Sequence, residues 1–328
     1  MQRGLKFRPE VVWSTAALAL FVLLSLAGVG CGGDETSQGD VGGQATLPPP
    51  LPPVETTLAS DTPEVATEEE LAVVEPREVS YEEAESTFLE RRYAEAVDLF
   101  MLYAERRAEN PWGHYMLGLS AWKSGDNWLA EEAFRRALEL DSTHVKSWLN
   151  LARVLLDEER ADEALEMIDE ALALEQESNV ALRLEARAYH QLGLLEEAID
   201  SYRQAILIDD EDAWSMNNMG LIYIEQERFD EALRPLARAV GLSPDIPIFH
   251  NNLGVALERT GHYRAAEDAF RAVLAIDDTY EKAEVSLVRV AGLEEDPDLL
   301  PVDLAELAQR FVDEVEGWRE AVAWRDWQ

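Results

Sequence analysis

The chain contains 328 residues and carries a formal net charge of -38, with 66 Asp and Glu residues against 28 Lys and Arg residues. This negative charge repels phosphate backbones and argues against a nucleic-acid-binding protein. An apolar content of 47% excludes a wholly disordered chain. With Cys31 as its one cysteine, the chain can form neither an internal disulfide nor a cysteine metal cluster.

The first thirty residues have the layout of a secretory signal peptide. Basic residues near the start precede an apolar stretch, residues 11–30, that ends in small residues. We therefore predict a signal peptide over residues 1–30. An uncleaved N-terminal transmembrane anchor is the alternative, because residues 11–30 supply the roughly 20 apolar residues that a bilayer crossing needs. Both interpretations place the rest of the chain outside the cytoplasm.

The residues around Cys31 resemble the signal of bacterial lipoproteins. The sequence Gly28-Val29-Gly30-Cys31 is similar to the family's lipobox, which usually has leucine where this chain has Gly28. The resemblance implies cleavage before Cys31 and attachment of lipid, palmitate included, to that cysteine. Gly32 rather than aspartate follows it, as in lipoproteins sorted to the outer membrane of a two-membrane cell.

Residues 31–76 are predicted to be a disordered tether that begins at the lipidated Cys31. They lack apolar periodicity and are rich in proline and acidic residues, so they cannot bury enough apolar area to offset the entropy of ordering. A tether of this kind has an end-to-end distance on the order of 40 Å.

From Arg77 onward the sequence repeats every 34 residues without a gap. The six blocks are residues 77–110, 111–144, 145–178, 179–212, 213–246 and 247–280, and an incomplete seventh begins at Glu281. Position eight is Ala or Gly, position twenty is Ala, and position twenty-four is bulky in every block. Small residues let two helices approach closely while bulky ones fill the space between them. Each block is therefore predicted to be a helix hairpin that buries its faces by stacking on its neighbours.

The turn inside three of the hairpins is marked by glycine. Gly125, Gly193 and Gly261 fall between the two apolar runs of their blocks, where a helix end favours a left-handed residue.

This period and these residues resemble the tetratricopeptide repeat, over residues 77 to about 280. The resemblance implies an all-α fold, a right-handed superhelix of helix-turn-helix repeats, and a concave groove that binds peptides or protein segments. RNA-binding pentatricopeptide arrays have a similar period, but the acidity and the constant 34-residue step disfavour them.

Within the resembled family, positions 2, 5, 6, 9, 12 and 13 of the first helix of each repeat tend to line the groove. The residues of this chain that the resemblance places there as partner-binding candidates are Trp112, Tyr115, Trp122, Lys146, Asn150, Arg153, Arg183, Arg187, Trp214, Asn217, Asn218, Asn251 and Asn252.

The cationic candidates are expected to bind an acidic segment or a C-terminal carboxylate of a partner. Arg183 and Arg187 are one helical turn apart, and guanidinium groups bind carboxylates with two parallel hydrogen bonds. The alternative is that they pair with neighbouring glutamates such as Glu185.

Asparagine recurs at position six of three blocks, as Asn150, Asn218 and Asn252. Similarly placed asparagines in the tetratricopeptide domain of O-linked N-acetylglucosamine transferases hold an extended peptide by its backbone, and an amide both donates and accepts hydrogen bonds. The alternative is that asparagine is simply common in this repeat. The tryptophans and Tyr115 are either apolar anchors for a partner or packing residues between repeats.

Residues 281–328 are predicted to form capping helices on the end of the repeats. Prolines interrupt the segment near residue 300, and an amphipathic pattern then ends in Trp318, Trp324 and Trp327. The alternative interpretation of these tryptophans is a surface for a partner or for self-association.

The sequence contains no phosphate-binding loop, nucleophile motif or metal-ligand spacing, so we expect no cofactor, no metal and no enzymatic activity. The expected function is a protein-protein interaction scaffold on the cell envelope. Lipoproteins of similar layout imply assembly of a pilus or secretin complex, an adaptor for cell-wall hydrolases is the alternative, and an enzyme is a distant one.

Overall fold

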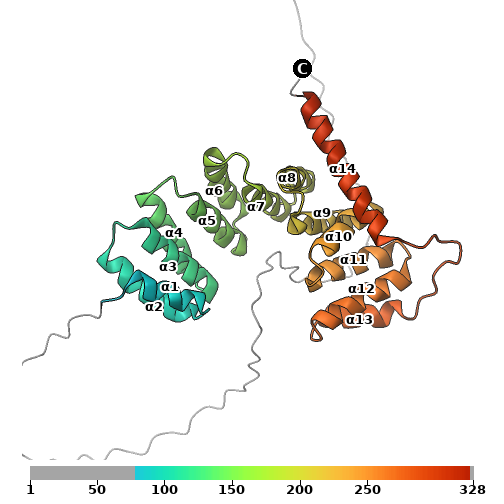
Figure 1. Cartoon of the computed structure of the whole chain (residues 1–328), viewed down its shortest axis with the longest axis horizontal. Helices are drawn as coiled ribbons and strands as arrows, with labels where there is room; N and C mark the ends of the chain where they lie inside the picture. Colours follow the sequence, from blue (N-terminus) through green and yellow to red (C-terminus); the bar gives the residue numbers. More distant parts are fainter. Residues whose placement is uncertain (1–77, 326–328) are drawn as a thin grey trace, which may run out of the picture. The chain divides into compact units, whose positions relative to one another are not determined.

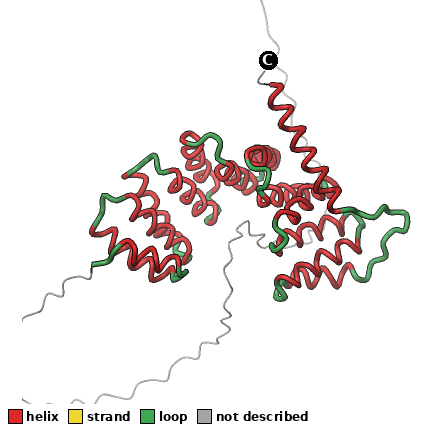
Figure 2. Tube along the Cα trace, in the orientation of Figure 1, coloured by secondary structure: helices red, strands yellow, loops and turns green. Residues whose placement is uncertain are grey.

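The computed structural model describes residues 78–325, which form fourteen α-helices and no strand (Figures 1 and 2). Residues 1–77, with the predicted signal peptide, Cys31 and the predicted tether, lie outside the described residues. The prediction of an all-α fold is confirmed. Within residues 78–325, no helix combines the length and apolar character needed to cross a membrane.

The helices alternate between the two members of successive hairpins, which we call A and B helices. The A helices are α1 (Tyr81–Leu89), α3 (Pro111–Ser124), α5 (Val145–Asp157), α7 (Asn179–Gln191), α9 (Ala213–Glu225), α11 (Pro247–Arg259) and α13 (Glu281–Val290). The B helices are α2 (Tyr93–Arg106), α4 (Asn127–Leu140), α6 (Ala161–Leu174), α8 (Leu195–Ile208), α10 (Phe229–Leu242) and α12 (Tyr263–Ile276). From α3 onward each A helix begins at the residue with which its 34-residue block begins.

The first A helix starts later than the period predicts. Its block begins at Arg77, whereas α1 begins at Tyr81. The side chain of Ser80 accepts a hydrogen bond of 3.1 Å from the backbone N–H of Glu83, and this N-cap fixes the start of the helix.

The small and bulky positions meet inside each hairpin as predicted. The alanines at position twenty are fully buried in all six blocks, and so are the bulky residues at position twenty-four. At position eight, a Cβ atom added to Gly118 would lie 2.8 Å from the ring of Phe134, and one added to Gly254 would lie 2.7 Å from Phe270. These contacts explain why position eight is restricted to Ala and Gly.

Every A helix of the six blocks is followed by a left-handed residue at position fifteen. The predicted glycines adopt it, with φ of 89° at Gly125, 75° at Gly193 and 86° at Gly261. The other three blocks place Arg91, Glu159 and Glu227 in the same conformation, with φ near 60°. All six hairpins therefore share the turn geometry. In three of them a residue with a side chain adopts the left-handed conformation, which costs more free energy than glycine does there.

The two helices of the C-terminal segment pack at different places on the array. α13 packs against α12, but α14 (Leu304–Arg325) packs mainly against α10 and also touches α8 (Figure 1). Phe311 and Val315 of α14 are buried there, and Glu314 forms an ion pair of 2.8 Å with Arg234 of α10. The predicted C-terminal helix is thus present, but it covers the fifth repeat rather than the end of the array.

Candidate functional site on the A helices

The thirteen predicted groove residues lie on five A helices, α3, α5, α7, α9 and α11, and we call the surface that they share the A-helix face. Hydrogen bonds connect neighbouring A helices across this face. Each joins two residues 35 positions apart, so the second residue lies one block position later than the first. The pairs are Tyr115 with Asn150, Trp122 with Asp157, Leu156 with Gln191, His190 with Glu225, and Asn217 with Asn252. The repeats are therefore joined by side chains as well as by apolar packing.

Trp112 is the most exposed aromatic of the predicted set, with 46% of its surface accessible. Its ring packs edge-on against Tyr115, with centroids 5.4 Å apart, and against His144 at 5.0 Å. The ammonium nitrogen of Lys146 lies 5.9 Å from the centroid of the Trp112 ring, within the range of a cation–π interaction. An apolar platform and an exposed cation thus lie side by side.

Burial changes the pKa values of Tyr115 and His144, the two groups whose rings pack against Trp112. Tyr115 is buried, and burial is the main reason that the pKa of its phenol is raised. For His144 burial has the opposite effect and lowers the pKa of the imidazole, although the negative charge of Asp141 raises it. The Nδ1 atom of His144 lies 2.6 Å from the hydroxyl of Ser147, while its buried Nε2 atom has no hydrogen-bond partner among the described residues.

Asn150 is buried rather than displayed to a ligand. Its Nδ2 atom donates to the carbonyl of Lys146 at 2.9 Å and to the hydroxyl of Tyr115 at 3.4 Å, and its Oδ1 atom accepts from Arg153 at 2.6 Å. Asn150 therefore holds Arg153 and Tyr115 in place.

Trp122 and Arg187 share one carboxylate. The indole N–H of Trp122 donates to Oδ2 of Asp157 at 2.9 Å, and Nη2 of Arg187 lies 2.7 Å from Oδ1 of the same residue. Asp157 thus links three consecutive repeats through α3, α5 and α7.

Arg183 is also engaged by an internal carboxylate. Its Nη1 atom lies 2.8 Å from Oδ1 of Asp212, whose side chain is only 2% exposed. Asp212 is the N-cap of α9 and accepts from the backbone N–H and the hydroxyl of Ser215. Arg183 and Arg187 therefore pair with internal carboxylates, as the alternative expected, but with Asp212 at the start of α9 and Asp157 at the end of α5 rather than with Glu185. Glu185 instead accepts a hydrogen bond from Ser201, and burial raises its pKa.

Four asparagines of α9 and α11 form a chain of amide hydrogen bonds. Asn251 donates to Asn252 at 3.4 Å, Asn252 donates to Asn217 at 3.0 Å, and Asn217 donates to Asn218 at 3.1 Å. Only Asn218 of these four is partly exposed. Trp214 packs its ring against Phe249, with centroids 4.8 Å apart, so it contributes to the packing between these two repeats.

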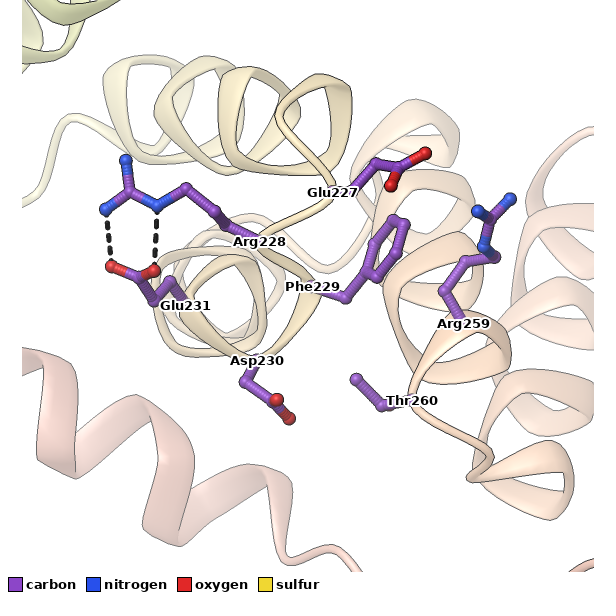
Figure 3. Close-up of a pocket in the computed structure, with 7 residues that line it drawn as sticks. All are labelled: Glu227, Arg228, Phe229, Asp230, Glu231, Arg259 and Thr260. Carbon is purple, nitrogen blue, oxygen red and sulfur yellow. Dashed lines mark hydrogen bonds and ion pairs between the residues drawn. The ribbon is translucent and has the colours of Figure 1, made fainter.

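An open pocket of about 230 Å³ lies away from the predicted residues, at the turn between α9 and α10. Its lining residues are Glu227, Arg228, Phe229, Asp230, Glu231, Arg259 and Thr260 (Figure 3). Arg228 is paired with Glu231 at 2.5 Å, and the guanidinium carbon of Arg259 lies 4.6 Å from the centroid of the Phe229 ring. Both signs of charge line this pocket, and its two guanidinium groups are already paired or stacked, so it offers no single ligand chemistry.

Sequence reasoning missed the residues that hold the candidates in place, namely His144, Asp157 and Asp212. Asp157 and Asp212 were hidden among 66 acidic residues. Their positions, at the end of α5 and at the N-cap of α9, were the available signal. No cluster of residues suited to a metal ion is present in the described part of the chain.

Comparisons with known proteins agree with this architecture. Sequence profiles described as "Tetratricopeptide repeat" match residues 115–179 and 217–281, and one described as "TPR repeat" matches residues 186–226. The chain is 25% identical over 217 residues to a protein named "Peroxisomal targeting signal receptor" of Candida albicans, covering 53% of this chain and 36% of that protein. It is 28% identical over 148 residues to "Protein STIP1 homolog" of Dictyostelium discoideum, covering 43% of this chain and 25% of the relative. The chain thus spans only a minor part of these curated relatives.

Two solved structures share the fold. The Cut9–Hcn1 hetero-tetramer of the APC/C gives a TM-score of 0.57 at 18% identity, covering 63% of this chain and 41% of that one. The pilF protein of Pseudomonas aeruginosa gives 0.51 at 20% identity, covering 56% and 84%. At such identities the likeness concerns the fold alone. The repeat profiles and the hairpin geometry together show that the chain is a tetratricopeptide-repeat protein, and helical arrays of this family are scaffolds for protein-protein interaction.

Proposed function

We propose that the A-helix face binds an extended segment of a partner protein, and that the end formed by Trp112 and Lys146 receives an acidic residue with an apolar neighbour. The observation that carries the proposal is the exposed Trp112 ring with the ammonium group of Lys146 5.9 Å from its centroid. Among the described residues, no carboxylate forms an ion pair with Lys146, and in a chain of net charge -38 an exposed cation of this kind favours an acidic ligand.

The remaining candidates act mainly as the support of this surface. Arg183 and Arg187 are held by Asp212 and Asp157, and the asparagines of α9 and α11 hold one another. A ligand that meets such a preorganised face pays less entropy on binding than one that must order it. The curated relative named as a targeting-signal receptor supports a peptide as the kind of ligand.

The test uses the full chain, labelled and applied to an array of ten-residue peptides that vary only in charge and in aliphatic content. We expect acidic-apolar peptides to be retained, and Trp112→Ala or Lys146→Glu to reduce their retention about tenfold or more, as expected for an interface anchor.

The matched controls are Trp128→Ala and Arg264→Glu, which remove an exposed tryptophan and reverse an exposed cation on the B helices α4 and α12. They should leave retention unchanged. Equal losses with the controls, or retention indifferent to peptide charge, would reject the A-helix face as the binding surface.

We further propose that lipid on Cys31 anchors this scaffold to the envelope, in a pilus or secretin assembly. Cys31 lies outside the described residues, so the support is the sequence Gly28-Val29-Gly30-Cys31 alone. Cys31→Ser should move the protein from the membrane fraction to the soluble fraction in cells. Continued sedimentation with an uncleaved N-terminus would instead indicate a transmembrane anchor. Recovery of cell-wall hydrolases rather than a secretin on co-purification would favour the adaptor role.

A further inference from the structure

The residues at position two of successive repeats form a row that begins where the described part of the chain begins. Position two is Glu78 in the first block, Trp112 in the second and Lys146 in the third. The A helices of these blocks follow in order, because α1 packs beside α3 and α3 beside α5 (Figure 1). The chain therefore enters the array one repeat before Trp112.

The contacts of α1 show that the first block keeps the register of the others. At position five, Tyr81 packs against Phe100 with ring centroids 5.8 Å apart, and the equivalent pair of the next block has centroids 6.0 Å apart. Val79 is only 4% exposed, so the backbone just before α1 is held against the core, while Glu78 is exposed. Because packed helices have axes about 10 Å apart, Glu78 lies roughly 10 Å from Trp112 along the row.

The sequence just before Glu78 has the composition that we propose for the ligand of this face. Residues 68–75 read Glu-Glu-Glu-Leu-Ala-Val-Val-Glu, with four acidic residues, four apolar ones and no basic one. They are the last part of the predicted tether and lie outside the described residues. In a chain of net charge -38, the attractive position for such a segment is an exposed cation without an ion-pair partner among the described residues, and Lys146 is one.

The length of the segment matches the distances along the row. An extended chain advances about 3.3 Å per residue, so the stretch from Glu78 back to Val74 spans about 13 Å and the stretch back to Glu70 about 26 Å. Trp112 and Lys146 lie roughly 10 and 20 Å from Glu78, one and two repeats away. The segment therefore reaches both residues, with slack to follow a curved surface.

We propose that residues 68–75 bind the A-helix face of their own chain and compete there with the partner segment. Val74 packs on the ring of Trp112, and the carboxylate of Glu70 pairs with the ammonium group of Lys146. This competition rests on the proposed function, because both ligands use the same surface.

The covalent connection makes even a weak contact effective. A segment joined to its site by a few residues has an effective concentration on the order of millimolar, which a partner in solution must exceed. If the segment leaves the face free in about one tenth of the molecules, an outside ligand binds about tenfold more weakly. The expected effect on partner binding is therefore about tenfold.

The first experiment detects the contact itself in the full chain, with a photoreactive benzophenone amino acid in place of Val73. After irradiation of a dilute sample, mass spectrometry should find a crosslink to α3 or α5 within one chain, and Lys146→Glu should reduce its yield about tenfold. The control has the benzophenone in place of Val65, further from the array, and should crosslink there far less. Equal yields at the two positions, or crosslinks only between differently tagged chains, would overturn the proposal.

The second experiment measures the competition, with a labelled peptide of residues 67–76 added to the full chain. An opened variant loses charges and apolar side chains of the segment through Glu69→Gln, Glu70→Gln, Val73→Ser and Val74→Ser, and it should bind the peptide about tenfold more tightly than the natural chain. The control variant carries the same kinds of change further from the array, Val54→Ser, Glu55→Gln, Glu64→Gln and Val65→Ser, and should bind like the natural chain.

The two proposals fail in different ways. Equal affinity of the opened and natural chains would mean that residues 68–75 do not compete, while the proposed function stands. If the opened variant binds neither this peptide nor any acidic-apolar peptide of the array, the A-helix face is not a peptide-binding surface and both proposals are wrong.

Discussion

Replacement of Gly220 by alanine is expected to destabilise the protein by about 1 to 3 kcal/mol, although alanine is the better helix former. Gly220 occupies position eight of α9, and a Cβ atom there would lie 2.5 Å from Cγ of Leu236, a fully buried residue of α10. The two helices must separate or the leucine must leave its preferred rotamer. Thermal or urea unfolding followed by circular dichroism measures the loss.

The matched control is Gly241→Ala, also in the helical hairpin of the fifth repeat. A Cβ atom at Gly241 of α10 meets nothing within 4 Å, so only the helix propensity changes and stability should rise by up to about 1 kcal/mol. The two substitutions are chemically identical and have opposite expected signs. Equal effects of the same sign would show that the close approach of α9 and α10 does not limit position eight.

Replacement of Asp212 by alanine is expected to cost about 2 to 4 kcal/mol. The change removes the N-cap of α9, which is worth about 1 kcal/mol, and it takes the carboxylate from the partly buried guanidinium of Arg183. Asp212 receives three hydrogen bonds from Arg183 and Ser215, so the loss should exceed that of an ordinary cap. Urea unfolding measures it.

Asp126 provides the comparison, because it caps α4 through a 3.0 Å hydrogen bond from Leu129 and is exposed. Asp126→Ala should cost only the cap, about 1 kcal/mol. A double-mutant cycle of Arg183→Ala with Asp212→Ala should show coupling of about 1 kcal/mol or more. Additive effects, or equal costs at Asp126 and Asp212, would mean that Arg183 is free to engage a ligand.

The hairpins were predictable because their requirements recur at fixed positions. Ala130 and its equivalents at position twenty are buried in every block, as are Phe134 and its equivalents at position twenty-four. The same packing requirement therefore appears six times in the sequence. The left-handed turn was predictable only where glycine marks it. Arg91, Glu159 and Glu227 adopt the same conformation without a residue preference that reveals it.

The docking of α14 was not predicted, although the sequence contains a signal for it. Position 22 of the 34-residue block, which lies in the B helix, is acidic in five of the six blocks. In the fifth block it is Arg234 of α10, the residue that pairs with Glu314. A single departure from a repeat pattern marks a position with a different neighbour, but only the folded chain shows which neighbour that is.

The sequence placed the candidate residues on the first helices of the repeats, but it did not reveal which carboxylates neutralise the cations among them. Helical spacing correctly placed Arg183 and Arg187 on one face. Which of many nearby carboxylates would neutralise them depended on how far each repeat rotates relative to the next. That rotation places Asp157 and Asp212 within 3 Å of the guanidinium groups, and a 34-residue period does not specify it.

The carboxylate of Asp157, shared by Trp122 and Arg187, has a consequence for cooperativity. In a stacked array each repeat usually contacts only its neighbours, so the stability of the array is the sum of the repeat stabilities and the interfaces between adjacent repeats. Here one aspartate gives the second and fourth repeats a common partner. Fraying of either unit releases a bond on which the other depends. The segment from α3 to α8 should accordingly open in hydrogen exchange as a single cooperative block instead of one hairpin at a time.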